Sequence, residues 1–285
     1  MSRDGRRSVR ATGWLPRDLA IRRPRGRVLC LWACLAVVFA AASGATVLSQ
    51  DQPAETLRIL AYNIHHGEGM DEILDLERIA ALIAAEQPDL VALQEVDRKV
   101  ERTDFVDQAL ALGELTGLTP VFGDFMPYQG GHYGMAVLSR WPVVEATNHR
   151  LPDGDEPRSA LAVRVQSPTS GRELEFVGIH LYRTAEERLA QAERLAEHLA
   201  STTVPVILAG DFNSLPESEV IQYLAQSWHF IDKGADRFTF SSFAPEREID
   251  FVAYRPVDAF RVVAQRLLDE PVASDHRPLF VELAW

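Results

Sequence analysis

The segment Val206–Pro216 constrains the fold most, because a buried strand leads there directly into polar residues. The apolar run from its first residue is typical of a short strand buried on both faces. The run stops at Gly210, and Asp211 and Asn213 follow in an i, i+2 relation. Alternation along a strand would point this carboxylate and this amide the same way. The segment therefore predicts either a reactive or binding site at a strand end or an Asx-type turn that caps the strand.

Apolar runs and helical periodicity predict a mixed α/β fold for the rest of the body. Helices are expected over residues 75–86, 105–116 and 185–201 and near 217–225. Strands are expected over residues 57–64, 90–95, 119–125, 133–140, 143–150, 161–166 and 174–181, from residue 206, and over 249–254, 261–267 and 279–283. Helices that alternate with hairpins argue against a purely parallel sheet. They favour a sandwich of two mixed sheets with helices outside.

Charge is divided unevenly along the chain. Residues 1–50 contain nine of the 29 basic residues and two of the 41 acidic ones, which leaves a net charge of −19 on residues 51–285. Such a domain should repel an extended polyanion such as duplex DNA, unless a local patch or a bound metal compensates. Both cysteines, Cys30 and Cys34, lie in the N-terminal part, so the body holds neither a disulfide nor a thiolate metal site.

The N-terminal part has the order of a targeting or anchoring segment. A basic segment at 1–27 precedes an apolar segment at 28–48, which is either a signal peptide or a transmembrane anchor. The anchor needs about 20 apolar residues, and the basic end would stay in the cytoplasm. A linker at 49–56 then leads to a domain at 57–285. Both alternatives place that domain outside the cytoplasm, exported or attached to the membrane through the N-terminal segment.

Several of the expected strands end in polar side chains that suit one reaction. They are Asn63, Glu95, His180, Asp211, Asn213, Asp250, Asp275 and His276. Each alone is explained by a cap or by a satisfied core histidine. Together, so many buried or half-buried acids would be costly without a cation or paired partners. The joint pattern favours a single site.

The same segments resemble the endonuclease/exonuclease/phosphatase superfamily, which has the DNase I-like fold. The similarity rests on an ordered set: Tyr62-Asn63-Ile64, Leu93-Gln94-Glu95-Val96, Gly134 to Arg140, Gly178-Ile179-His180-Leu181, Gly210-Asp211-Phe212-Asn213, Ile249-Asp250-Phe251 and Ser274-Asp275-His276-Arg277-Pro278. The resemblance implies a four-layer α/β sandwich of two mixed β-sheets flanked by helices. It places the site at one edge of the paired sheets.

The resemblance also implies a metal site. Glu95 would be the principal ligand of Mg²⁺, with Mn²⁺ as the alternative ion, and Asn63 and Asp275 would lie close to it. Carboxylate and amide oxygens suit such hard cations. The neighbouring pair His65 and His66 follows the first strand, where exposed turn histidines are expected and an added metal or phosphate contact is the alternative.

Catalytic roles follow from the resemblance in the same way. His276 would pair with Asp250, and Asp211 would position or deprotonate the attacking water. Asn213 and His180 would hold the phosphoryl oxygens while charge develops. A further residue, Arg158, would contact the substrate phosphate or else form an ordinary surface ion pair.

These features predict a Mg²⁺-dependent hydrolase that cleaves a phosphodiester with activated water. The acidic balance and the membrane address favour a phospholipid head group or a small phosphorylated molecule over nucleic acid. The segments from Asn63 to Gly67 and from Leu151 to Arg158 resemble a bacterial branch similar to the phosphodiesterase-like domain of GPI-lipid-remodelling proteins. The alternatives are an exported non-specific nuclease and a catalytically silent module that binds lipid or phosphate. The sequence leaves the oligomeric state open.

Overall fold

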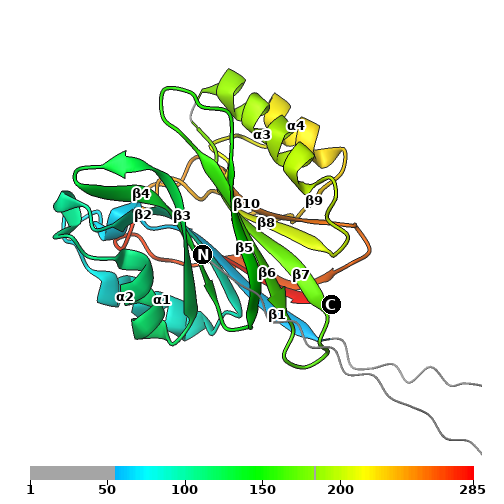
Figure 1. The fold of residues 1–285 in the computed structure, drawn as a ribbon, viewed down its shortest axis with the longest axis horizontal. Helices are drawn as coiled ribbons and strands as arrows, with labels where there is room; N and C mark the ends of the chain where they lie inside the picture. Colours follow the sequence, from blue (N-terminus) through cyan, green and yellow to red (C-terminus); the bar gives the residue numbers. More distant parts are fainter. Residues whose placement is uncertain (1–54, 183) are drawn as a thin grey trace, which may run out of the picture. The chain divides into compact units, whose positions relative to one another are not determined.

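The computed structural model describes residues 55–182 and 184–285. Two mixed β-sheets pack face to face between two pairs of helices (Figure 1). This arrangement confirms the predicted four-layer sandwich. The N-terminal segments expected at 1–27 and 28–48, and most of the linker at 49–56, lie outside the described residues. Within the part of the chain that is described, no helix is long and apolar enough to cross a bilayer.

The first sheet has the strand order β11-β12-β1-β2-β4-β3. Its strands are β1 (Thr56–Asn63), β2 (Leu90–Arg98), β3 (Thr119–Tyr128), β4 (Gly131–Ser139), β11 (Arg261–Leu267) and β12 (Leu279–Ala284). Helix α1 (Leu76–Glu86) joins β1 to β2, so these two strands are parallel, whereas the other neighbouring pairs are antiparallel.

The second sheet has the strand order β5-β6-β7-β8-β10-β9. Its strands are β5 (Val143–Arg150), β6 (Ser159–Gln166), β7 (Glu173–His180), β8 (Val206–Asp211), β9 (His229–Phe230) and β10 (Asp250–Arg255). Its single parallel pair is β7 and β8, joined by helix α3 (Ala185–Leu199). Each sheet therefore contains one strand–helix–strand unit with hairpin strands around it.

The remaining helices are α2 (Gln108–Thr116), α4 (Glu219–Ala225) and the short 3₁₀ turns η1 (His65–Gly67) and η2 (Glu101–Thr103). Side chains of both sheets form the central core, for example Ile59, Phe176 and Val252. A second core packs α1 and α2 on the first sheet, and a third packs α3 and α4 on the other. Figure 1 shows the two helix pairs on opposite outer faces of the sheets.

The parallel strands of both sheets end at one edge of the sandwich, which we call the site edge. Side-chain contacts join the end of β1 to the end of β8 there, through Asn63 and Asp211. The antiparallel neighbours begin at the same edge, since Asp250 at the start of β10 pairs with Asp211. Residues 274–276 precede β12, whose first residue pairs with Ala61 near the end of β1. The topology therefore gathers strand ends that are far apart in the sequence.

Two local details differ from the sequence expectation. The helix expected over 105–116 begins at Gln108, because the Asp107 side chain accepts the backbone N–H of Leu110 as an N-cap. Phe105 has a φ of 57°, in the left-handed region that a right-handed helix excludes. The two-residue strand β9 was not expected, since a segment this short has no readable alternation.

Gly134 in β4 provides a test of the packing beside the site edge. A Cβ at this position would overlap the carbonyl oxygen of Gly123 in β3. We expect Gly134→Ala to lower the free energy of unfolding by about 2 kcal/mol or more, as overpacking does when the neighbour is backbone. In the matched variant Gly178→Ala, the new methyl meets Met135 at 3.4 Å, an ordinary contact. For Gly178→Ala, urea unfolding should show a change in the free energy of unfolding below about 1 kcal/mol. Equal losses of stability in the two variants would contradict the packing described.

Candidate active site

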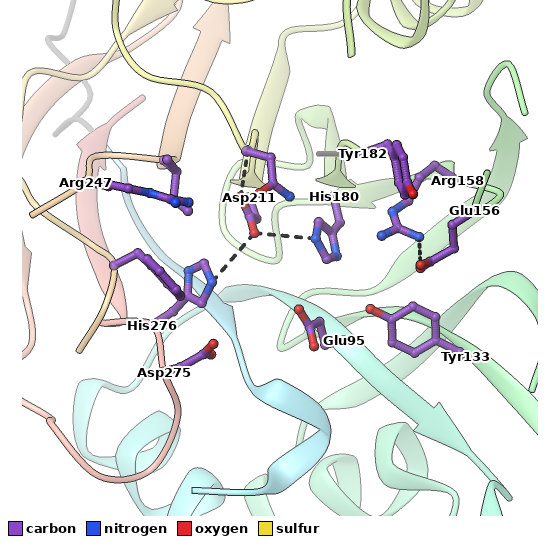
Figure 2. A pocket seen from close by; sticks show the side chains of 13 residues that line it. Glu95, Tyr133, Glu156, Arg158, His180, Tyr182, Asp211, Arg247, Asp275 and His276 are labelled. Carbon is purple, nitrogen blue, oxygen red and sulfur yellow. Dashed lines mark hydrogen bonds and ion pairs between the residues drawn. The ribbon is translucent and has the colours of Figure 1, made fainter. Parts of the chain in front are cut away.

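The carboxylate of Asp211, the last residue of β8, lies at the centre of a buried polar network (Figure 2). Its Oδ2 is 3.3 Å from Asn63 Nδ2, 3.5 Å from His180 Nε2 and 3.8 Å from His276 Nε2. Its Oδ1 accepts the backbone N–H of Asn213 at 2.7 Å. The structure thus brings together five residues that the sequence placed at four different strand ends.

Asp211 and Asn213 are connected by a turn and not by a continuation of the strand. Asn213 has a φ of 49°, so strand alternation ends at Asp211, and the expectation that alternation aligns the two side chains is wrong. The backbone N–H of Asn213 binds the Asp211 carboxylate, which is the Asx-type turn of the alternative interpretation. The Asn213 amide donates to the carbonyl of Leu181 at 2.9 Å. Both side chains nevertheless line the same cavity.

Glu95 reaches the cavity from a β-bulge in β2. Gln94 pairs with Met135 and Val96 pairs with Gly134, so Glu95 is the extra residue of the strand. Its φ of 57° lies in the left-handed region, a strained position for a non-glycine residue. A bulge of this kind redirects a side chain. The Glu95 Oε1 accepts a hydrogen bond from Asn63 Nδ2 at 3.1 Å.

His276, in the segment before β12, and Asp250, at the start of β10, form a buried pair. The two residues are 2.9 Å apart, from Nδ1 to Oδ2, and the ring of Phe240 lies 4.9 Å from the imidazole. Burial alone would lower the pKa of His276, but the charge and hydrogen bond of Asp250, together with Asp211, raise it to about 10. The imidazole is therefore cationic at neutral pH, with Nε2 directed toward Asp211.

Asp211 and His180 are shifted away from their ordinary protonation behaviour. Burial, reinforced by the charge of Asp250, raises the pKa of Asp211 to about 7. Burial and the nearby charges of Arg158 and His276 hold the pKa of His180 well below its usual range, so its imidazole is neutral. Within the described residues, His180 Nδ1 has no hydrogen-bond partner. A carboxylate that titrates near neutrality beside a neutral and a charged imidazole is suited to proton transfer.

The cavity around these groups has a volume of about 280 Å³. Its lining includes six residues that the sequence analysis does not predict as site residues: Tyr133, Glu156, Tyr182, Phe240, Arg247 and Ile249. Tyr133 and Tyr182 adjoin segments that carry the family resemblance, and Ile249 lies in one of them. Glu156 is two residues before Arg158. Phe240 and Arg247 belong to the segment between β9 and β10, which carries no pattern that predicts its position. Figure 2 shows Arg247 across the cavity from Arg158.

Arg158 is a cavity residue, and its interactions differ from those of a surface ion pair. It is only 5% exposed, and its guanidinium pairs with Glu156. The guanidinium carbon also lies 5.0 Å from the ring centre of Phe125 and 5.5 Å from that of Tyr182. These contacts hold a positive charge against the cavity wall. The position is compatible with the predicted contact to substrate phosphate.

The residues predicted to bind metal have a donor set that suits a hard cation. Glu95 and Asp275 both line the cavity, and Asn63 is buried between Glu95 and Asp211. The Asn63 amide nitrogen faces both carboxylates, while its oxygen accepts the backbone N–H of His65. Glu95, Asp211 and Asp275 thus place three carboxylates at one cavity, and a divalent cation would offset their negative charge.

The two histidines after β1 are not both exposed. His66 is only 8% exposed, and burial lowers its pKa to about 4, so the expectation of an exposed turn residue is wrong for this side chain. The ligand atoms of His65, His66 and Glu95 lie within 4.8 Å of one another. Asp211, Asp250 and His276 form a second such group.

The sequence pattern of the Endonuclease/Exonuclease/phosphatase family matches residues 60–276, which include every site residue described above. The chain belongs to this family. Its members are hydrolases of phosphoester bonds, which assigns the chain to the phosphoesterases or nucleases. Enzymes of the family typically depend on a divalent metal, and the acidic and histidine groups at the site edge provide candidate ligands. The narrower resemblance to GPI-lipid-remodelling proteins stays a prediction.

Individual relatives support the family assignment. The Escherichia coli protein YbhP is 27% identical over 245 residues, which cover 80% of this chain and 96% of YbhP. Nocturnin from Xenopus laevis is 32% identical over 207 residues, covering 63% of this chain and about half of nocturnin, 53%. A crystal structure of an endonuclease/exonuclease/phosphatase from Beutenbergia cavernae has a TM-score of 0.69 at 29% identity. The match covers 80% of this chain and 71% of the Beutenbergia chain.

The raised pKa of Asp211 predicts a pH-dependent stability difference. A carboxyl whose pKa is about 7 in the folded protein and 3.8 as a free group stabilises the fold below pH 4, and this contribution is lost as the pH rises through 7. An Asn at this position has no such titration. Relative to wild type, Asp211→Asn should therefore gain stability between pH 4 and pH 8 in EDTA. Thermal unfolding across this range measures the difference, and a difference independent of pH would contradict the shift.

Proposed function

We propose that the domain is a divalent-metal-dependent phosphoesterase that hydrolyses a phosphodiester in a compact substrate with activated water. The observation that carries the proposal is the position of the Asp211 carboxylate. It lies between the neutral imidazole of His180 and the cationic imidazole of His276, in a cavity shared with Glu95. The candidate base, Asp211, and the positive charge of His276 thus face the same cavity.

Each residue has a role that follows from its protonation state. Asp211, with a pKa of about 7, is suited to accept the proton of the attacking water. His276 remains protonated and offers Nε2–H to the negative charge that develops on a phosphoryl oxygen. Asp250 holds this ring in position through Nδ1, and His180 offers a neutral hydrogen-bond donor. Asn63 and the backbone of Asn213 fix the Asp211 carboxylate.

The metal in this proposal is Mg²⁺, with Mn²⁺ as the alternative. Glu95 and Asp275 would hold it, with Asn63 beside them. When bound, such an ion supplies positive charge for the phosphoryl oxygens and the leaving group. The neighbouring carboxylate of Asp211 would be more easily ionised next to a cation.

The size and charge of the site favour a compact substrate. A cavity of about 280 Å³ accommodates a phosphoryl group with a small alcohol, while the net charge of −19 on residues 51–285 disfavours a long polyanion. A mannosyl-6-phosphatase from Bacteroides thetaiotaomicron has a similar fold, with a TM-score of 0.66 at 21% identity. Together with the predicted export or membrane attachment, this favours a phospholipid head group or a small phosphorylated molecule.

The first test measures hydrolysis of bis-p-nitrophenyl phosphate with Mg²⁺, with Mn²⁺ and with EDTA. Glu95→Gln and His276→Ala should each lower kcat by about 100-fold or more, because each removes a charge that the transition state needs. The matched control is His198→Ala, since His198 is hydrogen-bonded to the Arg150 carbonyl and stacked on the His149 ring, and it does not line the cavity in the described part of the chain. Activity that survives in both site variants while they remain folded would refute the assignment.

An exported nuclease is the second candidate, and the arginines at the site favour it. Arg158 and Arg247 line the cavity, and Arg188 lies in an adjoining cavity of about 540 Å³ that shares Asn213 and Arg247. Cations in this arrangement could follow a phosphate backbone.

Supercoiled plasmid and phospholipid vesicles, incubated beside the small diester, separate the candidates. Hydrolysis of the diester or lipid with intact plasmid supports the leading proposal, whereas rapid nicking of the plasmid identifies a nuclease. Hydrolysis of p-nitrophenyl phosphate alone identifies a phosphomonoesterase. Binding of phosphate or lipid without hydrolysis of any substrate identifies the silent binding module.

A further inference from the structure

The turn after β1 holds two consecutive histidines in an unusual conformation. His65 and His66 have φ angles of 46° and 47°, and Gly67 continues with 81°. Non-glycine residues rarely adopt this region, and two in succession require that the surroundings fix them. The carbonyl of His66 accepts the Gln108 side chain at 2.6 Å, and the N–H of His65 binds the Asn63 side chain at 3.1 Å. The turn is thus fastened to α2 and to the end of β1.

This conformation brings both imidazoles close to Glu95, and His66 Nε2 also lies 3.6 Å from a carboxylate oxygen of Glu68. One ligand atom from each of the three residues lies within 4.8 Å of the others. The two rings contact edge to face with centres 4.5 Å apart. His65 Nδ1 is 3.1 Å from the carbonyl of Glu68, which leaves its Nε2 for another partner. His66 is 8% exposed, and within the described residues its Nδ1 has no hydrogen-bond partner.

A buried imidazole nitrogen without a partner is costly unless it binds a proton donor or a cation. Imidazole nitrogen is a softer ligand than carboxylate oxygen and suits transition metals better than Mg²⁺. The proposed hydrolysis uses neither histidine. Two imidazoles and one carboxylate, held by a fixed backbone, match the ligand chemistry of a divalent transition-metal ion.

We propose that His65, His66 and Glu95 form a mixed nitrogen–oxygen site for a divalent transition-metal cation such as Zn²⁺. Glu95 belongs to this site and to the hard-cation site at the cavity, so the two metals share one carboxylate. The inference rests on the proposed function only in taking Glu95 as a metal ligand. Because the two histidines supply nitrogen ligands, we expect the protein to bind transition metals that a site built of oxygen ligands alone would not favour.

The test uses Co²⁺ as the probe, because its visible absorption reports its ligands. The full chain, without a histidine tag and in mild detergent, is stripped with EDTA and titrated with Co²⁺ by calorimetry and absorption in excess Mg²⁺. His65→Asn and His66→Asn should each weaken Co²⁺ binding at least about tenfold, since even loss of a group that only supports a ligand has that effect. Both should also shift the absorption bands. Asn tolerates the left-handed backbone, so these variants keep the turn.

Two controls separate this site from other histidines. His149 and His198 stack with ring centres 4.6 Å apart but belong to no group of three ligands among the described residues. His149→Asn and His198→Asn should leave Co²⁺ binding unchanged. Bands that move only in His276→Ala would place the ion at Asp211 and Asp250 and overturn the inference. Absence of Co²⁺ binding, or binding unaffected at His65 and His66, would also overturn it.

Hydrolysis measured in the same samples distinguishes this inference from the proposed function. Co²⁺ binding that depends on both histidines, without hydrolysis of any phosphoester, would support the site and refute the function. Mg²⁺-dependent hydrolysis with Co²⁺ binding indifferent to both histidines would support the function and refute the site.

Discussion

The site depends on one physical constraint, the burial of the Asp211 carboxylate where the two sheets meet. A buried carboxylate without partners is strongly unfavourable, so the fold must bring donors to it. Asn63 comes from β1, His180 from β7 and His276 from the segment before β12, so the donors come from both sheets. The compensation is incomplete, because the pKa of Asp211 is still raised to about 7. Because part of the desolvation free energy is not compensated, Asp211 titrates near neutral pH.

Much of this arrangement could be predicted from the sequence, because it depends on where apolar runs stop. Strands buried on both faces are read directly from such runs, and a polar residue that follows one must lie at a sheet edge. Asn63, His180 and Asp211 are of this kind. The topology then adds what spacing cannot show. Each sheet has one parallel pair, and the antiparallel neighbours begin where these strands end, which brings Asp250 and His276 to the same edge.

The parts that could not be predicted depend on local backbone conformation or on long-range packing. Glu95 faces the cavity because of a bulge, and Asn213 lies in a turn where its own φ is positive. The sequence of both segments is nevertheless typical of a regular strand end. His66 is buried, and its backbone carbonyl accepts a hydrogen bond from Gln108, a residue 42 positions away. Arg247 lies in an irregular segment between β9 and β10. Positive φ values at Glu95, Asn213 and both turn histidines gather strain at the site edge, where the rigid sheets support it.

The electrostatics of the domain bear on the size of its substrate. Residues 51–285 carry a net charge of −19, yet Arg158 and Arg247 line the cavity. Screening limits the reach of exposed charges to about 8 Å at physiological ionic strength. A small anion inside the cavity would therefore interact mainly with the groups that line it, which are these arginines, four carboxylates and any bound metal. A long polyanion would also lie over the acidic surface outside, and each further phosphate would add repulsion. Under the proposed function, this repulsion outside the cavity is what would favour a compact phosphoester over an extended nucleic acid.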